Sequence, residues 1–557
     1  MLRYAKFLAL APLVAVLLLP ALRTEGAPAT AYEEFDDVPR THWAHADIQA
    51  LRSLSVTQGV GDNMFGLGNS LTRAEFITFL SKLLDWEAEG GGDPWYAAFV
   101  DAGIKKGAIV GQASDFRPND PITREEMAVM LVRSMGYDTL ASQLDSLPQP
   151  FSDVDTNIGY ISLAKDFGII YGTAPGLFSP DQTATREQAA AMMVRLYNKL
   201  AQASSSYASA GWKRANAFYA ISSSSQTSLI SSLDQVSFGW SRIEWKDGVS
   251  LNFTSTNANE YHRPDGYEEV LGLAKSGGKK ALLSVSVEGK TVTASGNPEV
   301  SGEMPLSAYL ISRDQFRSHM VSLIAEAAIG YDGVVADFEN MSGEKSKSDY
   351  VLFLRALKAA LPAGSSYLAV TVQPPRAGGL AYFDGYDFKE IGEIADEVIL
   401  MAHDYEAKSL TPEEMKTGFT VTPLSPINEV YYALSAVCDP DNGVADKSKV
   451  TLQISFSSCQ WKTVDGEITN RTPFTPDLAA ILSRISSGAQ QHYSLKYENP
   501  FVTFLSEEGA DNIVWYENKQ SAEAKLRLAS LMGVQGVSFW RLGLIPPDFA
   551  QSFSSKI

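Results

Sequence analysis

From residue 213 onward, short apolar runs alternate with helical patterns, and this alternation limits the possible folds more than any other feature. Eight runs have strand character, and they lie at residues 215–221, 236–243, 281–287, 334–339, 368–373, 398–402, 450–456 and 536–540. Most are separated by stretches with helical periodicity, for example 313–328, 348–360 and 521–531. Eight strands with helical crossovers predict an α/β TIM (β/α)₈ barrel whose chemistry sits at the C-terminal ends of the strands. A doubly wound open sheet is the alternative, and no glycine fingerprint for a nucleotide supports it.

The fourth of these runs ends in two acids, within the stretch YDGVVADFEN at residues 331–340. Strand residues two positions apart share a face, so Asp337 and Glu339 point the same way, about 7 Å apart along the backbone. Acids at the end of an apolar strand are costly to bury unless they have a role. A pair in which one acid orients or charges while the other donates a proton is typical of glycoside hydrolysis. Two acids that only cap the next helix are the alternative.

Composition limits the class of protein and its partners. The chain has 557 residues, which is too many for one ordinary domain and ample for a large core. Its hydrophobic content of 45% and charged content of 20% are those of a globular protein. The formal net charge of −19 argues against nucleic acid and against anionic membrane as partners.

The first residues have the pattern of a targeting segment. Arg3 and Lys6 precede an apolar run at 7–22, and small residues follow at 27–31. This pattern predicts a secretory signal peptide over residues 1–31 that is removed, which leaves no attachment to the membrane. An uncleaved anchor helix is the alternative, although the run is short for a membrane span.

Secretion makes the two cysteines, Cys438 and Cys459, a possible disulfide. In the predicted barrel, Cys438 ends a helix at the bottom and Cys459 follows a strand at the top. Their sulfurs should then lie roughly 20 Å apart, whereas a disulfide needs Cα atoms about 6 Å apart. The sequence therefore predicts two free thiols that act as small hydrophobic side chains.

Internal repetition organises the first 200 residues. The segment LTRAEF at 71–76 recurs as ITREEM at 122–127 and as ATREQA at 184–189, each time after a phenylalanine and turn residues. Each segment opens an apolar-periodic helix with threonine at the N-cap, and Glu75 and Glu126 lie at the third helical position of the first two. This is the capping-box arrangement, so the sequence predicts three helical repeats.

Together with the F-x-D-V openings at 35–38 and 151–154, these repeats closely resemble S-layer homology (SLH) modules. The resemblance implies three all-α modules, at residues 32–92, 93–146 and 147–200. Such modules hold secreted proteins non-covalently on Gram-positive cell walls through an anionic secondary wall polysaccharide. A Ser/Ala-rich passage at 201–212 is predicted to be a linker, and the barrel then spans 213–557.

One arginine follows the helix cap in each repeat: Arg73, Arg124 and Arg186. A guanidinium beside free backbone N–H groups suits a carboxylate or a ketal-linked pyruvate on the wall polymer. The three arginines are therefore predicted to bind that polymer. The alternative is that each arginine only pairs with a neighbouring acid.

The barrel region resembles glycoside hydrolase family 18, the chitinase-like enzymes. DGVVADFE at 332–339 resembles the family signature D-G-x-D-x-D-x-E, with a departure at Val335. MAHD at 401–404 looks like the family's M-x-Y-D segment, with His403 where tyrosine is expected. GVSFWRLG at 536–543 looks like the eighth strand, and IVWYEN at 513–518 resembles the approach to it in the spore-cortex and wall-lytic branch. Val335 lies beneath Asp337 on the same strand face, where the family has an acid or an amide.

This resemblance implies retaining, substrate-assisted hydrolysis without an enzyme nucleophile. Glu339 would protonate the glycosidic oxygen and later activate water, while Asp337 would hold the 2-acetamido group of the substrate. The substrate-binding residues that it implies are Met401, His403, Asp404 and Trp540. The chemistry needs no cofactor and no metal, and the six histidines show no metal-binding spacing.

Two classes of function remain open from the sequence. The first is a secreted, wall-anchored glycosidase that cleaves β-linked N-acetylglucosamine in peptidoglycan or in chitin-like glycans. The second is a catalytically silent glycan-binding or surface-layer protein that uses the barrel as a lectin. Retention of Glu339 favours the enzyme, because silent relatives typically lose this acid.

Overall fold

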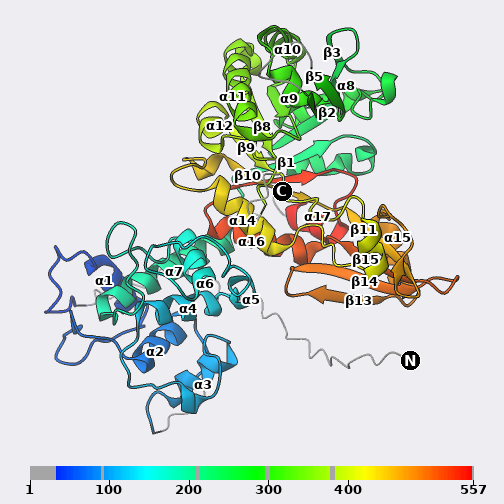
Figure 1. Cartoon of the computed structure of the whole chain (residues 1–557). Coiled ribbons are helices and arrows are strands. Elements are labelled where there is room, and N and C mark those ends of the chain that lie inside the picture. Colours follow the sequence, from blue (N-terminus) through cyan, green and yellow to red (C-terminus); the bar gives the residue numbers. More distant parts are fainter. Residues whose placement is uncertain (1–32, 89–92, 208–211, 295–301, 377–382, 555–557) are drawn as a thin grey trace. The chain divides into compact units, whose positions relative to one another are not determined.

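The computed structural model describes residues 33–88, 93–207, 212–294, 302–376 and 383–554 (Figure 1). The chain forms two compact units, which we describe separately: residues 1–127 with 181–197, and residues 128–180 with 198–557. The predicted signal peptide, residues 1–31, lies outside the described residues. Within those residues, the structure has no helix long and apolar enough to cross a membrane.

The repeat region is helical. Its elements are α1 (His45–Ser53), α2 (Arg73–Leu83), α3 (Ala97–Lys105), η1 (Ala113–Asp115), α4 (Arg124–Ser134), α5 (Asp138–Ala141), α6 (Ile158–Asp166) and α7 (Arg186–Tyr207). The predicted capping box is present at α2, where the Thr72 side chain accepts from the Glu75 N–H and the Glu75 side chain accepts from the Thr72 N–H. The Ser/Ala-rich passage continues α7 as far as Tyr207, because alanine favours a helix and serine is tolerated in it. The first residues of the predicted linker are therefore helical.

The three repeats close on one another through the strand-like residue that precedes each N-cap. The Leu71 N–H donates to the Ala184 carbonyl at 3.0 Å, the Ala184 N–H to the Ile122 carbonyl at 2.9 Å, and the Ile122 N–H to the Leu71 carbonyl at 2.9 Å. This cyclic set of backbone hydrogen bonds gives the three segments equivalent surroundings. It explains why the same sequence motif recurs in all three repeats.

The second unit contains a closed barrel of eight parallel strands. They are β1 (Arg214–Tyr219), β2 (Gln235–Trp245), β4 (Lys280–Val287), β7 (Gly333–Asp337), β8 (Tyr367–Val372), β9 (Glu397–Leu400), β10 (Val450–Ser455) and β16 (Gly536–Trp540). Their order is β1-β16-β10-β9-β8-β7-β4-β2, and pairing of β1 with β2 closes the barrel. These are the eight predicted strands, so the predicted barrel is confirmed. The open sheet is excluded.

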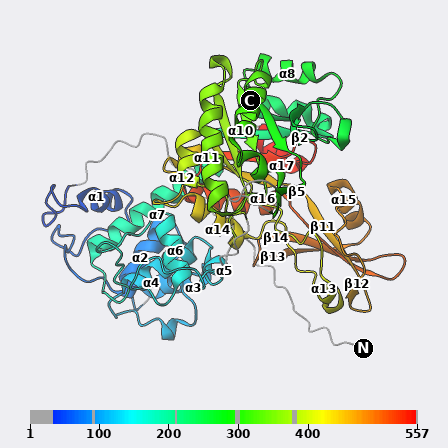
Figure 2. The same ribbon diagram turned by 45° about the horizontal axis from the view of Figure 1, so that its top comes forward.

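Helices surround the barrel. They are α8 (Tyr267–Ser276), α9 (Leu306–Ile311), α10 (Asp314–Ala327), α11 (Gly343–Ala360), α12 (Phe388–Ile394), α14 (Ile427–Val437), α16 (Lys519–Leu531) and α17 (Pro547–Ser554), with short 3₁₀ turns η2 (Ser223–Ser232), η3 (Thr256–Ala258), η4 (Ala363–Ser365) and η5 (Lys447–Lys449). Helices α10, α11 and α12 pack side by side on the outside of the strands (Figures 1 and 2).

The interior of the barrel contains both apolar and hydrogen-bonded polar side chains. A buried cluster consists of Phe218, Leu282, Val335, Ala369 and Ile399, with Trp540 packed against it. Val335 therefore lies on the inner face of β7, as predicted, and is fully buried. Gly333 opens the same strand because a Cβ there would lie 2.0 Å from the carbonyl oxygen of Tyr367.

A second sheet is inserted between β10 and β16, and it was not predicted from the sequence. Its strands are β11 (Ser458–Val464), β12 (Glu467–Ile468), β13 (Gln490–Ser494), β14 (Asn499–Leu505) and β15 (Asp511–Tyr516), in the antiparallel order β12-β11-β15-β14-β13. The other small elements are β3 (Val249–Asn252), the hairpin of β5 (Thr291–Ala294) and β6 (Gly302–Pro305), α13 (Pro412–Thr417) and α15 (Leu478–Ser486). The segment 513–518, which was interpreted as an approach to the eighth strand, is largely β15 of this sheet.

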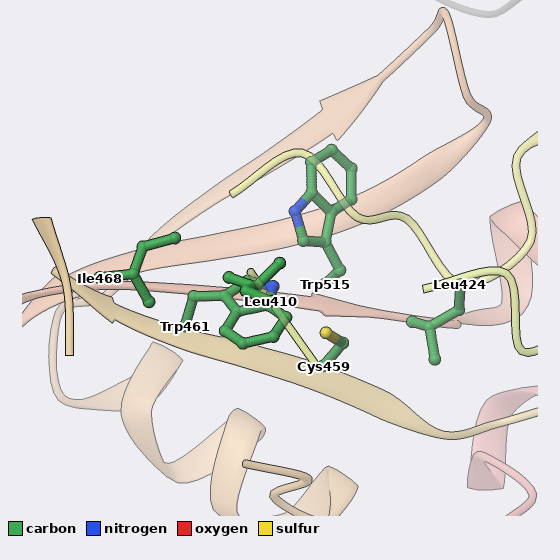
Figure 3. Packing of buried hydrophobic residues seen from close by; sticks show 6 residues of the cluster. All are labelled: Leu410, Leu424, Cys459, Trp461, Ile468 and Trp515. Atoms are coloured by element: carbon green, nitrogen blue, oxygen red, sulfur yellow. The ribbon is translucent and has the colours of Figure 1, made fainter. Parts of the chain in front are cut away.

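One face of the inserted sheet covers a buried apolar cluster: Leu410, Leu424, Cys459, Trp461, Ile468 and Trp515. Figure 3 shows these side chains, which come from the segments before α13 and α14 and from β11, β12 and β15. The Trp461 indole N–H donates to the Thr422 hydroxyl at 2.7 Å, so the one polar group of this ring is satisfied. Cys438 and Cys459 are both buried free thiols.

Candidate active site

The end of β7 is fixed by hydrogen bonds to three successive backbone groups. The Phe338 carbonyl accepts from the Tyr386 hydroxyl at 2.8 Å, and the Glu339 carbonyl accepts from the Ser307 hydroxyl at 2.6 Å. The next backbone N–H, that of Asn340, donates to a buried glutamine, Gln373, at 2.5 Å. These bonds fix the backbone at Glu339, and its side chain remains accessible to a ligand.

Asp337 is partly buried and takes its support from the neighbouring strand. The hydroxyl of Thr371, on β8, donates to Asp337 Oδ1 at 2.6 Å. Burial raises the pKa of Asp337, and the Thr371 hydrogen bond and the charge of His403 oppose this rise. Val335 beneath it is apolar, so the support for Asp337 comes from the side, through the hydrogen bond from Thr371.

Glu339 has the electrostatics of a general acid. Desolvation by the surrounding protein, together with the Asp337 and Asp404 carboxylates, raises the pKa of Glu339 to about 8. The acid therefore keeps its proton at neutral pH. A pKa near the working pH is what proton transfer to a leaving group requires.

Asp404 follows β9, and its pKa is shifted in the opposite direction from that of Glu339. Burial acts to raise the pKa of Asp404, but His403 and Lys408 outweigh it and hold that pKa well below its usual range. The carboxylate lies 3.1 Å from His403 Nδ1 and 3.7 Å from Lys408 Nζ. The site thus shifts the pKa values of Asp404 and Glu339 in opposite directions.

Trp540, at the end of β16, and Tyr261, in the loop after β3, form an aromatic pair. The ring of Trp540 is 5.3 Å from that of Phe218 and 6.3 Å from that of Tyr261. Burial and then the charges of Asp337 and Glu339 raise the pKa of Tyr261, which places its hydroxyl in the field of both acids. Both Trp540 and Tyr261 are partly exposed, so they can contact a ligand next to the acids.

The structure therefore brings Asp337, Glu339, His403 and Asp404 into one electrostatic cluster at the C-terminal end of the barrel. Met401 begins the segment after β9, and its N–H donates to the Val372 carbonyl at 3.0 Å. Sequence reasoning missed Thr371 and Tyr261. Neither lies in a recognisable motif, and only strand pairing and loop packing show their position.

In the first unit, two of the three predicted polymer-binding arginines have partners in another repeat. The Arg73 Nε–H donates to the Phe116 carbonyl at 2.6 Å, and its guanidinium also pairs with Glu126. In the same way, the Arg186 Nε–H donates to the Phe65 carbonyl at 2.9 Å and its Nη1 lies 2.8 Å from Glu75. Arg124 is buried as well. These arginines therefore contribute to closure of the three repeats.

Groups of three or more histidine, cysteine, aspartate or glutamate side chains that could hold a metal ion are absent from the described part of the chain. The site consists of acids, one imidazole and aromatic rings on a parallel barrel. Such a site is that of a barrel glycosidase: paired acids for proton transfer and rings for sugar stacking.

Comparison with protein families gives the particular family. Residues 304–544 match the model described as "Glycosyl hydrolases family 18", and residues 34–77, 90–128 and 150–190 match the "S-layer homology domain". The chain therefore carries a family 18 glycosyl hydrolase domain preceded by three SLH domains. The catalytic domain is that of a glycosidase, and the SLH domains indicate association with a bacterial cell wall or S-layer.

Curated relatives match one part of the chain or the other. The "Cortical fragment-lytic enzyme" of Bacillus anthracis is 22% identical over 276 residues, which are 48% of this chain and 60% of that protein. The "Exoglucanase XynX" of Acetivibrio thermocellus is 33% identical over 180 residues, 30% of this chain and 16% of that protein. The chain thus spans less than two thirds of the length of either relative.

Among solved structures, the spore cortex-lytic enzyme SleL of Bacillus cereus resembles the chain with a TM-score of 0.48 and 19% identity. The match covers 61% of this chain and 73% of that one. A chitinase from Chromobacterium violaceum has the same TM-score with 18% identity, and the match covers 61% and 98% of the two chains.

Proposed function

We propose that this protein is a wall-anchored glycoside hydrolase that cleaves β-linked N-acetylglucosamine-containing polysaccharide by substrate-assisted, retaining hydrolysis. The polymer would be peptidoglycan or a chitin-like glycan. The observation that carries the proposal is the pair at the end of β7: Asp337 is fixed by the Thr371 hydrogen bond, and Glu339 beside it has a pKa raised to about 8.

In the first step, Glu339 donates its proton to the glycosidic oxygen as the C1–O bond breaks. The carbonyl oxygen of the substrate's own 2-acetamido group attacks C1 from the opposite face and forms an oxazolinium ion. Asp337 Oδ1 accepts from Thr371, which leaves Oδ2 to accept the acetamido N–H and to stabilise the positive charge that develops. The enzyme supplies no nucleophile.

In the second step, the Glu339 carboxylate removes a proton from water as the water oxygen attacks C1. The oxazolinium ring opens, the acetamido group is restored, and Glu339 is again protonated. Two inversions at C1 give net retention. Asp404 hydrogen-bonds substrate near the cleaved bond, Trp540 stacks on the sugar ring, and Met401 and His403 belong to the same binding region.

The polymer is identified by incubating the full-length chain with peptidoglycan and with chito-oligosaccharides, followed by mass analysis of the products. The proposal expects fragments cut at the reducing side of N-acetylglucosamine in at least one of the two substrates. Binding to both glycans with no new reducing ends would instead identify a silent lectin, and the catalytic proposal would be wrong.

We also propose that the three SLH modules bind an anionic secondary wall polysaccharide, with Arg73, Arg124 and Arg186 contributing. A carboxylate or ketal-pyruvate on the polymer would complement the guanidinium groups and the N–H groups at the helix starts. The first unit is predicted to use the same arginines for closure and for binding.

The full-length chain is expected to pellet with purified Gram-positive walls and to stay in solution with walls from which the acidic polymer was stripped. Replacing the three arginines by alanine should weaken pelleting. Because two of them close the repeats, each variant is first compared with wild type by thermal melting. Undiminished pelleting with stripped walls would rule out the anionic polymer as the ligand.

A further inference from the structure

We propose that His403 is a protonated positioning residue, a fixed positive charge between Asp404 and Gln453 that keeps the neighbouring acids in their working charge states. Its ring would then act through the protein's own acids instead of donating to the substrate. The inference rests on the proposed function for its consequences in catalysis. Its structural basis is independent of that function.

Both ring nitrogens of His403 lie near oxygen atoms of the protein. Nε2 is hydrogen-bonded to Gln453 Oε1 at 2.7 Å, and Nδ1 lies 3.1 Å from Asp404 Oδ2 in an ion-pair contact that lacks hydrogen-bond geometry. An imidazolium donates to Gln453 and places a positive charge beside the Asp404 carboxylate, whereas a neutral imidazole leaves that carboxylate without the charge. The side chain is 7% exposed, so solvent does not substitute for either partner.

The barrel interior orients the amide of Gln453. Its Nε2 group donates to the Ser538 hydroxyl oxygen, at 3.4 Å, and the same oxygen accepts from Asn216 Nδ2 at 3.2 Å. Asn216 Oδ1 in turn accepts from the Ser237 hydroxyl at 3.1 Å. This chain of buried hydrogen bonds directs the Gln453 carbonyl oxygen toward His403. A reversed amide would present an N–H to the ring and leave the imidazole neutral.

The charges around the ring favour the imidazolium. Burial acts against protonation, but Asp404, the Gln453 hydrogen bond and Glu406 outweigh it and raise the pKa of His403. From β7, Asp337 and Glu339 face the same region, and Lys408 is the other cation near it. Four carboxylates thus surround one buried ring.

The positive charge of His403 lowers the pKa of each of the neighbouring acids. It favours the ionised form of Asp404, and it lowers the pKa values of Asp337 and Glu339 against the desolvation that raises them. Without it, all three acids would bind protons more tightly. The charge therefore favours the ionised forms of Asp337 and Asp404 and limits the rise in the pKa of Glu339.

The direct test is nuclear magnetic resonance of the full-length chain with ¹⁵N-labelled histidine rings. The chain has six histidines, and loss of one signal set in His403→Gln assigns this ring. We expect two protonated ring nitrogens on His403 at pH 7.5. A single protonated nitrogen there would overturn the proposal, and a proton on Nδ1 alone would indicate the reversed Gln453 amide. This readout does not depend on activity, so it stands even where the proposed function fails.

The kinetic test compares pH–rate profiles of wild type, His403→Gln and His492→Gln. On the acidic side the rate falls as Asp337 and Asp404 gain protons, and on the alkaline side it falls as Glu339 loses one. Removal of a nearby positive charge raises all three pKa values, so both limbs should move to higher pH by on the order of one unit. His492, exposed on β13, is the control and should leave the profile unchanged. An unchanged profile for a folded His403→Gln variant would refute the positioning role.

Discussion

A Glu339→Gln variant is expected to cleave N-acetylglucosamine polymers roughly 10²–10⁴-fold more slowly than wild type, because the amide keeps the shape of the side chain but has no proton to transfer. The backbone bonds from Ser307 and Tyr386 do not involve this side chain, so the fold should be kept. Initial rates of reducing-end formation measure the effect. Glu344→Gln, at an exposed position in the first turn of α11, is the matched control and should retain full activity.

The pH dependence of the wild type follows from the same residue. The pKa of Glu339 is raised to about 8, so the acid is protonated at neutral pH and the rate should fall as the pH rises through that value. If the Glu339→Gln variant cleaved the substrate as fast as wild type, Glu339 would not be the general acid.

Replacing Lys525 by methionine is expected to lower the free energy of unfolding by about 3–5 kcal/mol, because it leaves the buried carboxylate of Glu517 without its counter-charge. Lys525 Nζ lies 3.2 Å from both Glu517 oxygens and donates to the Glu498 carbonyl at 2.7 Å. The two side chains are 0% and 1% exposed. Hydroxyls of Ser425 and Ser521 and the Asn499 amide N–H also donate to Glu517.

This buried network joins α16, the loop before α14 and the inserted sheet, so its loss should destabilise all three segments. Lys519→Met is the control on the same helix, since Lys519 makes only a partly exposed pair with Glu523 at 3.8 Å. Its effect should stay below about 1 kcal/mol. Denaturant midpoints of the two variants give the comparison. Equal shifts would show that the Lys525–Glu517 pair does not stabilise this region.

The barrel was predictable because each strand is a short apolar run between helical patterns. The run that ends at Asp337 and the run that ends at Trp540 are both buried on the inside and the outside of the barrel, so their sequences are mainly apolar. The capping boxes at Thr72 and Thr123 were predictable for a similar reason, since the cap and its partner lie within one turn of helix.

The inserted sheet was not predictable in the same way. Strand β13 reads Gln-Gln-His-Tyr-Ser and is mostly exposed, so it lacks the apolar alternation that marks a half-buried strand. Thr371 and Tyr261 were missed because their roles depend on contacts between segments far apart in the sequence. The pairing of Arg73 and Arg186 with acids of other repeats likewise depends on closure of the three repeats, which a local motif does not encode.

The central claim is that the substrate's own acetamido group acts as the nucleophile, and hydrolysis of matched sugar oligomers tests it most directly. N-acetylated chito-oligosaccharides are compared with the same oligomers after removal of the acetyl groups, and the first product is followed by proton nuclear magnetic resonance. The account predicts cleavage of the N-acetylated oligomers with the β-anomer as the first product, and no detectable cleavage of the de-N-acetylated ones. Similar rates for both oligomers, or the α-anomer as the first product, would contradict it.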